Sequence, residues 1–573
     1  MEMKWRVLEA KKEVVSALAS SLSVSKSIAT LLALRGIDTF DKSKEFFRPS
    51  LNMLHDPFLM KDMNKSVARI YKAIEKGEKI MVYGDYDVDG STAVSLVFGF
   101  FASLYKNIEY YIPDRYAEGY GLSFQGVEYA KQENISLIIT LDCGIKAVDK
   151  VEKANGYNID VIICDHHTPG TEIPEAYGII NPKQHDCPYP YKELPGCGIG
   201  FKLCYAYCIK NNLPLKKALH YIDLVAIAIG CDIVPITGEN RVLTYLGLQK
   251  INSSPNLGVM GLLETAKVKE GIPITVEDLV FKVGPRINAA GRIKHAKEAV
   301  ALLSNGDKKE ASHLAKLIHE HNEERKGLDK QTTSQALEVI EADPFYKTAK
   351  STVVYNDHWH KGVIGIVASR LIENHYKPTI VFTKSGEKAA GSARSVKGYN
   401  VYKAIDACKD HLIQFGGHKY AAGLTIKPEN IPAFRQSFDD YVSETLLPEQ
   451  LSPEIEIDLE LDFEEITDKF YRILKQFAPF GPHNMKPIFI TKNVLDAGYT
   501  KLVGADKTHV KFHLKQKNSN MSFNGIGFSM GKWHDAIKEG VPHDYIYSIE
   551  ENYWNGNVSL QLSIRGIRIS ETA

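Results

Sequence analysis

The sequence has few of the features that mark membrane, exported or disulfide-rich proteins. Its eight cysteines in 573 residues form no Cys-x-x-Cys pair, which excludes a zinc ribbon and fits no disulfide framework. The longest apolar run, residues 224–236, is interrupted by Gly230, Asp232 and Pro235 and falls short of the roughly 20 residues that a membrane span needs. Residues 1–14 are charged throughout and lack the apolar core of a secretory signal. We therefore expect a cytoplasmic protein with no membrane segment.

Neither charge sign is in excess, because 70 Lys and Arg residues balance 70 Asp and Glu residues. This balance points to no polyanionic partner, although equal totals can conceal a basic face. With 44% hydrophobic and 24% charged residues, the composition excludes collagen-like and wholly disordered chains. The length predicts about three to five domains.

Short apolar runs alternate with helical patterns in the first third of the chain. This alternation is typical of a parallel α/β sheet. The pattern predicts strands at 79–83, 108–112, 136–141 and 160–164, with helices near 91–105, 123–133 and 145–154.

A charged stretch at 307–342 has apolar residues at helical spacing and no proline until Pro344, which predicts a long helix that bridges two domains. A second α/β unit should follow and end near Leu447. Its strands are predicted near 352–355, 379–383 and 388–393, with a helix near 363–374.

The last segment has the alternation of β structure. Acidic and apolar residues alternate over 454–463, which predicts one half-buried strand. Further strand-like runs at 487–494, 508–514 and 557–569 suggest a small β-barrel or sandwich. Residues 451–468 hold eight acidic and no basic residues, whereas 469–573 hold 14 basic and eight acidic residues, a net charge of +6. A basic β module can bind nucleic acid, but an ordinary solvated surface explains the charge equally well.

Three of the early strands are followed by acidic residues. The carboxyl ends of parallel strands open onto one crevice, so these side chains should converge. Crowded carboxylates repel one another unless a cation lies among them, and carboxylate oxygens with an imidazole suit manganese or magnesium. The residues are Asp85, Asp87 and Asp89 after the first strand, Asp142 after the third, Asp165, His166 and His167 after the fourth, and Asp232 after a later apolar helix.

Each of these motifs has an ordinary structural explanation when it is taken alone. The Asp-x-Asp-x-Asp-Gly run could be a turn, but it is not an EF-hand, because position 12 of that loop is Leu96 instead of glutamate. A His-His pair after a strand is more often a turn or a surface pair than a ligand site. The combination at consecutive strand ends favours a metal site.

Three glycine-containing segments suit phosphate binding. GSARS at 391–395 combines hydroxyl groups with an arginine, GGHKYAAG at 416–423 allows close backbone approach, and GPRINAAGR at 284–292 places two arginines in a predicted loop of small residues. Taken singly, each of the first two is more simply explained as a tight turn, and the two arginines of the third are ambiguous.

Together these motifs carry a family resemblance. Three motifs in order along the chain resemble the DHH phosphoesterase superfamily: GDYDVDG at 84–90, LDCG at 141–144 and DHH at 165–167. Further motifs narrow the resemblance to bacterial exonucleases specific for single-stranded DNA. These are PDR at 113–115, EGYGL at 118–122, the 284–292 segment, WHKGVIGIVASR at 359–370, and the 391–395 and 416–423 segments.

The resemblance implies an α/β fold with two α/β domains joined by a long helix and followed by an oligonucleotide-binding (OB) β-barrel. The expected units are a helical lead-in at 1–60, a DHH domain at 61–306, the connecting helix at 307–345, a DHHA1 domain at 346–450 and the OB domain at 451–573. The implied activity is 5′-to-3′ hydrolysis of single-stranded DNA to 5′ mononucleotides in recombination and repair. The implied partners are single-stranded DNA, a single-strand-binding protein and a RecQ-type helicase.

The resemblance also implies a site for two Mn²⁺ or Mg²⁺ ions, with Asp142 bridging them and His167 facing the scissile phosphate. Smaller members of the superfamily carry a histidine four residues before the Asp-x-Asp pair, where this chain has Asp85 two residues before it. Asp87 with Asp89 is therefore the firmer ligand pair, and direct ligation by Asp85 stays open. The implied ligands are Asp85, Asp87, Asp89, Asp142, His166 and Asp232, and the implied substrate contacts are Arg115, Ser392 and Arg394 at the 5′ phosphate and His167, Arg286, Arg370 and His418 along the strand.

Two other functions stay open at this stage. The first is a DHH phosphodiesterase for short oligonucleotides, cyclic dinucleotides or pyrophosphate, although such enzymes are usually shorter and lack the barrel. The second is a non-catalytic replication scaffold, although such relatives have lost metal ligands and the ligand positions here are complete.

Overall fold

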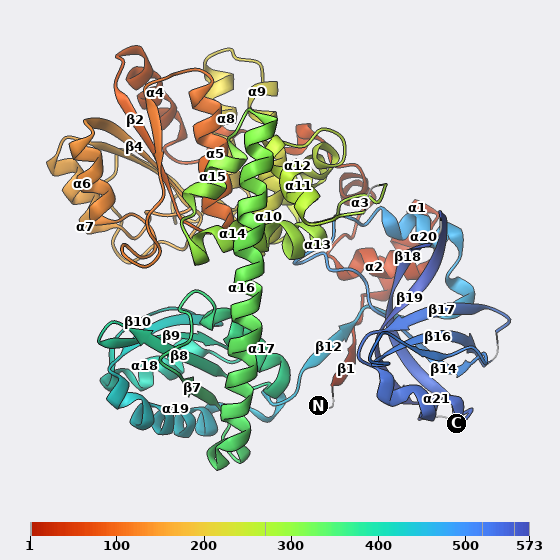
Figure 1. Cartoon of the computed structure of the whole chain (residues 1–573). Helices are drawn as coiled ribbons and strands as arrows, with labels where there is room; N and C mark the ends of the chain where they lie inside the picture. Colours follow the sequence, from red (N-terminus) through yellow and green to blue (C-terminus); the bar gives the residue numbers. More distant parts are fainter. Residues whose placement is uncertain (1–2, 270, 518, 555, 572–573) are drawn as a thin grey trace.

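The computed structural model describes residues 3–269, 271–517, 519–554 and 556–571. Figure 1 shows two α/β units stacked along one long helix, α16 (Lys308–Ala342), with a β-barrel beside them. This is the fold class that the sequence predicted. The domain boundaries proposed above remain a prediction.

The first α/β unit contains a parallel sheet in the order β3-β2-β4-β5-β6. The first four of these strands in the chain were predicted, and the short edge strand β6 was missed. Because each strand is joined to the next by a crossover, helices cover both faces of the sheet. The elements are α4 (Met63–Glu75), β2 (Lys79–Gly84), α5 (Val88–Ala102), β3 (Ile108–Tyr111), α6 (Phe124–Gln132), β4 (Ile135–Leu141), α7 (Val148–Gly156), β5 (Asp160–Cys164) and β6 (Gly178–Ile180).

A layer of helices completes this unit and leads to the long helix. The predicted loop at 284–292 is wrong: these residues form helix α14, because small residues let the helix pack closely against its neighbours. The helices are α8 (Gly196–Lys210), α9 (Lys216–Leu219), α10 (Ile222–Cys231), α11 (Gly238–Ile251), α12 (Leu257–Thr265), α13 (Val276–Asp278), the π-helix η3 (Leu279–Val283), α14 (Gly284–Ile293) and α15 (Lys297–Leu303).

Helix α16 spans both α/β units. Its 35 residues correspond to a length of about 52 Å. The Asp307 side chain caps its start by accepting hydrogen bonds from the backbone N–H groups of Lys309 and Glu310, both at 2.9 Å. It ends two residues before Pro344, as the sequence predicted.

The second α/β unit has a mixed sheet in the order β10-β11-β9-β8-β7, in which only β7 and β8 run parallel. The GSARS segment, expected as a turn, lies largely in strand β9. The GGHKYAAG segment forms the hairpin of β10 and β11, with its turn at Lys419 and Tyr420. The elements are β7 (Thr352–Tyr355), α17 (Ile364–His375), β8 (Thr379–Ser385), β9 (Lys388–Arg394), α18 (Val401–Ala407), β10 (Leu412–His418), β11 (Ala421–Ile426) and α19 (Ile431–Thr445).

The C-terminal sheet has the order β13-β14-β18-β19-β17-β16-β15, and a further β14–β16 pairing closes it into a barrel. The single strand predicted at 454–463 is wrong. It splits at Asp458, whose partly buried carboxylate accepts a hydrogen bond from the Ile488 backbone N–H at 2.9 Å. The elements are β12 (Glu454–Ile457), β13 (Leu459–Glu460), α20 (Asp468–Lys475), β14 (Phe489–Asp496), β15 (Lys501–Val503), β16 (His509–Gln516), β17 (Ser522–Gly527), α21 (His534–Lys538), β18 (His543–Trp554) and β19 (Asn557–Ile569).

The beginning of the chain packs against this barrel. Strand β1 (Lys4–Val7) pairs in parallel with β12. Helices α1 (Lys12–Leu22), α2 (Lys26–Leu34) and α3 (Phe40–Phe47) follow it. Leu18, Ile28 and Leu32 of these helices share one apolar core with Phe463 and Phe489 of the barrel unit.

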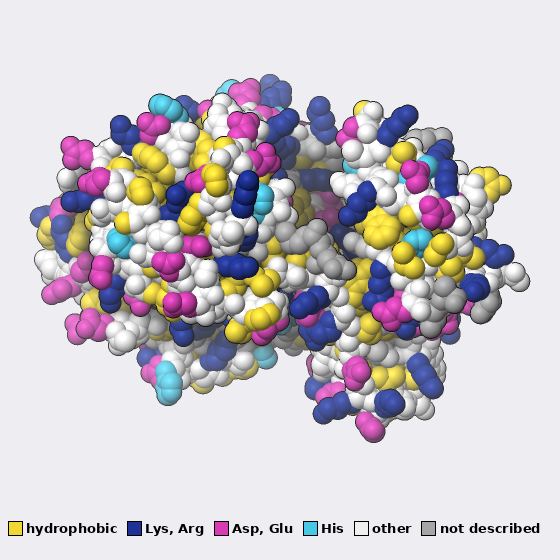
Figure 2. Space-filling view, turned by 90° about the horizontal axis from the view of Figure 1, so that it is seen from below, with side chains coloured by type: hydrophobic (Ala, Val, Ile, Leu, Met, Phe, Trp, Pro, Cys, Tyr) yellow, Lys and Arg dark blue, Asp and Glu magenta, His cyan; other side chains and the backbone are white. Residues whose placement is uncertain are grey.

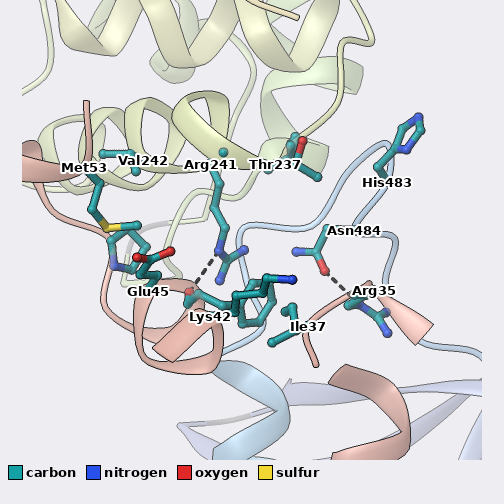
Figure 3. Close-up of a pocket in the computed structure, with 14 residues that line it drawn as sticks. Arg35, Ile37, Lys42, Glu45, Met53, Thr237, Arg241, Val242, His483 and Asn484 are labelled. Atoms are coloured by element: carbon teal, nitrogen blue, oxygen red, sulfur yellow. Dashed lines mark hydrogen bonds between the residues drawn. The ribbon is translucent and has the colours of Figure 1, made fainter. Parts of the chain in front are cut away.

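One buried arginine joins the first α/β unit to the barrel. Arg241 of α11 donates hydrogen bonds to backbone carbonyls on both neighbouring segments, and its guanidinium lies 3.8 Å from the centre of the Phe46 ring. Figure 3 shows it beside a pocket of about 220 Å³ that Arg35 and Asn484 also line. The carbonyls belong to Phe46, Gln476, Phe477, Ala478 and Pro479.

Figure 2 shows acidic and basic side chains intermingled over the lower face of the molecule, in keeping with the balanced charge of the sequence. Among the residues that the structure describes, no helix is both long and apolar enough to cross a membrane.

Candidate active site

The carboxyl edge of the first sheet gathers the predicted acids. Asp85 directly follows β2 and is fully buried. Asp87 begins helix α5 and accepts a hydrogen bond from the Gly90 backbone N–H at 3.0 Å. Asp89 lies in the first turn of α5 and faces the start of α8, where the backbone N–H groups of Gly196 and Cys197 donate to its two oxygens at 2.6 and 2.7 Å.

Close backbone packing fixes these acids in place. Asp142, directly after β4, has a left-handed φ of 58°, a conformation that aspartate tolerates better than most residues. A Cβ atom on Gly196 would lie 2.5 Å from the Cβ of Asp142, and one on Gly90 would lie 2.4 Å from the backbone oxygen of Asp85. Side chains at either glycine would displace the acids.

One imidazole lies among three of the carboxylates. The Nε2 atom of His166 is 3.1 Å from Asp142 Oδ1, 3.5 Å from Asp232 Oδ2 and 3.8 Å from Asp89 Oδ2. Potential ligand atoms within 4.8 Å of one another form two groups that share His166. These are Asp142, His166 and His167, and Asp89, His166 and Asp232.

Burial and mutual repulsion control the charges of this cluster. Burial raises the pKa of Asp89 to about 7, and the charge of Asp87 contributes to the rise. Burial likewise raises the pKa of Asp142 well above its ordinary value, with further contributions from Asp89, Asp87, Asp232 and Asp85. Burial lowers the pKa of His166 to about 3, so its imidazole is neutral. A cation among these groups would restore the charged form of the acids.

These residues fit divalent metal ions. Asp85 Oδ2, Asp142 Oδ1 and both ring nitrogens of His166 are buried without a hydrogen-bond partner among the described residues. Buried polar atoms are usually paired, so these atoms are available to ligate an ion. Carboxylate oxygens with one imidazole form a donor set that suits Mn²⁺ or Mg²⁺. Asp85 and Asp87 border the two ligand groups without belonging to either.

The second histidine belongs to a hydrogen-bonded chain. His167 Nδ1 lies 2.7 Å from Asp165 Oδ1, and its Nε2 lies 3.0 Å from the Tyr120 hydroxyl, which donates to the Asp142 backbone carbonyl at 3.1 Å. Burial disfavours the charged imidazole, but the hydrogen bond to Asp165 and the charges of Asp165, Asp89 and Asp87 together outweigh it and raise the pKa of His167. A protonated ring donates from both nitrogens, which matches this arrangement.

An arginine cluster lies between the two α/β units. Burial, followed by the charges of Arg115, Arg325 and Arg394, lowers the pKa of Arg292 to about 9. Arg394 of β9 donates to the Ser392 hydroxyl at 3.1 Å. Like charges that are close together and partly buried need a counterion, so this cluster is suited to a phosphate group.

The other predicted substrate contacts lie in different surroundings. Arg370 forms a bidentate ion pair with Asp329 of α16 through Nε and Nη2. Arg286 donates to the backbone carbonyls of Lys282 and Thr265 at 2.6 and 3.2 Å. His418, at the end of β10, faces the first unit: burial lowers its pKa, and the charges of Lys146 and His167 lower it further.

Sequence reasoning gave no role to several residues of this site. Tyr120 lies within the EGYGL motif at 118–122, where a tyrosine between two glycines beside an acidic cluster was an available signal. Arg292 was noted as one of two ambiguous arginines, and Arg325 lies in the charged stretch that was predicted only as a bridging helix. Lys183, whose charge opposes the raised pKa of Asp232, carried no local signal.

The fold and site define a two-unit phosphoesterase architecture, and family models match both units. The DHH family N-terminal domain matches residues 79–229 and the DHHA1 domain matches 348–444. The RecJ OB domain matches residues 457–566.

Whole-chain comparisons identify the family. The chain is 37% identical to the single-stranded-DNA-specific exonuclease RecJ of Bacillus subtilis, over 100% of this chain and 71% of that protein. It is 32% identical to RecJ of Escherichia coli, over 99% of this chain and 100% of that protein. A crystal structure of Thermus thermophilus RecJ with Mn²⁺ matches with a TM-score of 0.83 and 27% identity, over 100% of this chain and 80% of that one. The chain belongs to the RecJ family.

Proposed function

We propose that this chain is a metal-dependent exonuclease that hydrolyses single-stranded DNA from the 5′ end to 5′ mononucleotides, in DNA recombination and repair. The observation that carries the proposal is the pair of ligand groups that share His166 in the first α/β unit. An arginine cluster lies between this unit and the second α/β unit. The relatives named above are exonucleases specific for single-stranded DNA, and the Thermus protein binds Mn²⁺.

Two Mn²⁺ or Mg²⁺ ions held by Asp85, Asp87, Asp89, Asp142, His166 and Asp232 would supply a hydroxide from water and offset charge on the phosphate. The chain's own residues prepare the site for this chemistry. Backbone N–H groups at the start of α8 hold Asp89. Asp165 orients His167, whose protonated Nε2 would donate to an oxygen of the scissile phosphate once it leaves Tyr120. No covalent enzyme intermediate is required.

The arginine cluster would hold the 5′ end of the strand. Arg115, Ser392 and Arg394 supply donors for a terminal phosphate, which carries more charge than an internal one. His418 would contact the adjoining backbone from the second unit. Arg370 retains its Nη1 group for a phosphate, because its hydrogen bonds to Asp329 use Nε and Nη2. Arg286 would contribute through Nε, which is buried without a partner among the described residues.

The decisive assay uses a 5′-phosphorylated single strand labelled at its 3′ end. We expect Mn²⁺ or Mg²⁺ to produce a ladder that shortens from the 5′ end, while EDTA abolishes cleavage and blunt duplex resists it. Persistence of the strand together with hydrolysis of a cyclic dinucleotide or pyrophosphate would favour the small-substrate enzyme. Failure to cleave any of these substrates would favour the scaffold.

Replacing Arg394 with Ala should weaken the use of 5′-phosphorylated DNA about tenfold or more in kcat/KM, because a charged hydrogen bond to the terminal phosphate is lost. A 5′-hydroxyl strand of the same sequence should lose much less. Arg472 of α20, which is exposed, gives the control variant Arg472→Ala. An equal loss on both strands would contradict the assignment of Arg394 to the terminal phosphate.

We also propose that the protein acts in the cytoplasm, where its eight free cysteines would stay reduced. A single-strand-binding protein and a RecQ-type helicase remain the predicted protein partners.

A further inference from the structure

Every strand of the first parallel sheet is followed by polar side chains at its carboxyl end. Strands β2, β4 and β5 deliver the acids and histidines, and the edge strand β3 is followed by Arg115. The opposite edge strand, β6, is followed by Asn181, Pro182 and Lys183. The acid cluster therefore lies between two cationic side chains, Arg115 after the outer strand β3 and Lys183 after the outer strand β6.

The segment after β6 is fixed beside the two histidines of the site. Asn181 is fully buried, and its side-chain amide donates to the His167 backbone carbonyl at 2.9 Å. Its side-chain oxygen accepts from the Lys183 backbone N–H at 2.8 Å. A single buried asparagine thus ties Lys183 to the strand that carries the histidines.

The ammonium group of Lys183 is only loosely paired. Lys183 follows β6, which pairs with β5, and the buried Asn181 bonds both the Lys183 backbone N–H and the His167 backbone carbonyl. Among the described residues its Nζ forms a long ion pair, 3.7 Å from Glu193 Oε2, and the Glu193 side chain is 44% exposed. Such an exposed pair contributes little and leaves the ammonium group available.

We propose that Lys183 binds the DNA phosphate on the 3′ side of the scissile one. The sheet order separates β3 from β6 by four strand spacings, about 19 Å, too far for Arg115 and Lys183 to share a phosphate. With the terminal phosphate at Arg115 and the scissile phosphate over the acid cluster, the strand continues toward Lys183. This inference rests on the proposed exonuclease function. It implies that the DNA strand runs from its 5′ end at β3 toward β6, across the carboxyl ends of the β-strands.

The test compares two 5′-phosphorylated oligonucleotides in the full-length protein with Mn²⁺. A dinucleotide has only the terminal and scissile phosphates, whereas a trinucleotide adds the phosphate assigned to Lys183. For Lys183→Ala, we expect kcat/KM of the first cleavage to fall about tenfold on the trinucleotide and less than twofold on the dinucleotide. Lys183→Arg should retain most of the trinucleotide activity.

Glu193→Gln is the matched control, because it removes the partner of Lys183 and keeps the lysine. Its trinucleotide activity should stay within twofold of wild type. Equal losses of Lys183→Ala on both oligonucleotides, loss of the effect at high Mn²⁺, or the same loss in Glu193→Gln would each overturn the assignment, because Lys183 would then act on the fold or the metal ligands.

Binding separates this inference from the proposed function. In an Asp142→Asn background, which prevents cleavage, 3′-labelled oligonucleotides report affinity by fluorescence anisotropy. Lys183→Ala should weaken trinucleotide binding and leave dinucleotide binding unchanged. A wild-type protein that cleaves neither oligonucleotide contradicts the exonuclease proposal, whereas unchanged trinucleotide binding in Lys183→Ala contradicts the role of Lys183 alone.

Discussion

Replacing Asp142 with Asn will reduce kcat/KM on single-stranded DNA by about a thousandfold or more, because metal-assisted charge stabilisation contributes several kcal/mol. Asp142 is the acid that approaches His166 most closely, at 3.1 Å, and its Oδ1 is buried without a hydrogen-bond partner among the described residues. An amide has the same shape but lacks the charge that attracts the ions.

Thermal unfolding distinguishes this loss from misfolding. In EDTA the Asp142→Asn variant should be at least as stable as wild type, because it removes a buried carboxyl group whose ionisation is opposed by burial and by the neighbouring carboxylates. Mn²⁺ should raise the midpoint temperature of unfolding of the wild-type protein more than that of the variant, since ligands stabilise the state that binds them. Asp149→Asn, at an exposed position of α7, is the control. Retention of a tenth of the activity at saturating Mn²⁺ would disprove this role for Asp142.

Replacing Arg241 with Ala will lower the free energy of unfolding by about 3 to 5 kcal/mol, because buried carbonyls lose their donor. Five backbone carbonyls on two segments accept hydrogen bonds from this one guanidinium. Its aliphatic stem and its contact with Phe46 are lost as well.

Urea denaturation followed by fluorescence measures this effect, with the exposed Arg472→Ala as the control. We expect the barrel and the first α/β unit to unfold in separate steps in the Arg241→Ala variant, because this arginine joins them. A decrease below 1 kcal/mol with one cooperative step would show that other contacts hold the two units together.

Much of the fold was predictable because its signals are local. The buried strands β2, β4 and β5 are short apolar runs bounded by turns, and α16 has a capping aspartate at its start and a proline after its end. The sequence could not predict the pairing of β1 with β12, which lie some 450 residues apart and depend on tertiary contacts.

The metal ligands were predictable because a parallel sheet places consecutive strand ends at one edge. The contacts of Tyr120, Arg292 and Lys183 were not, since each depends on segments distant in sequence or on a strand as short as β6. The helix at 284–293 was also missed, because its two glycines and its proline predict a loop unless close packing selects the helix.

The shared core of α1, α2 and the barrel has a consequence for biosynthesis. Helices α1 and α2 are made first, yet their apolar partners, beginning with Leu461, emerge roughly 430 residues later, about 20 to 90 s at ribosomal rates. During that interval Leu18, Ile28 and Leu32 remain exposed to chaperones. Removing residues 451–573 would make the exposure permanent. Loss of DNA binding by such a truncated chain could then result from aggregation as readily as from the loss of a DNA contact.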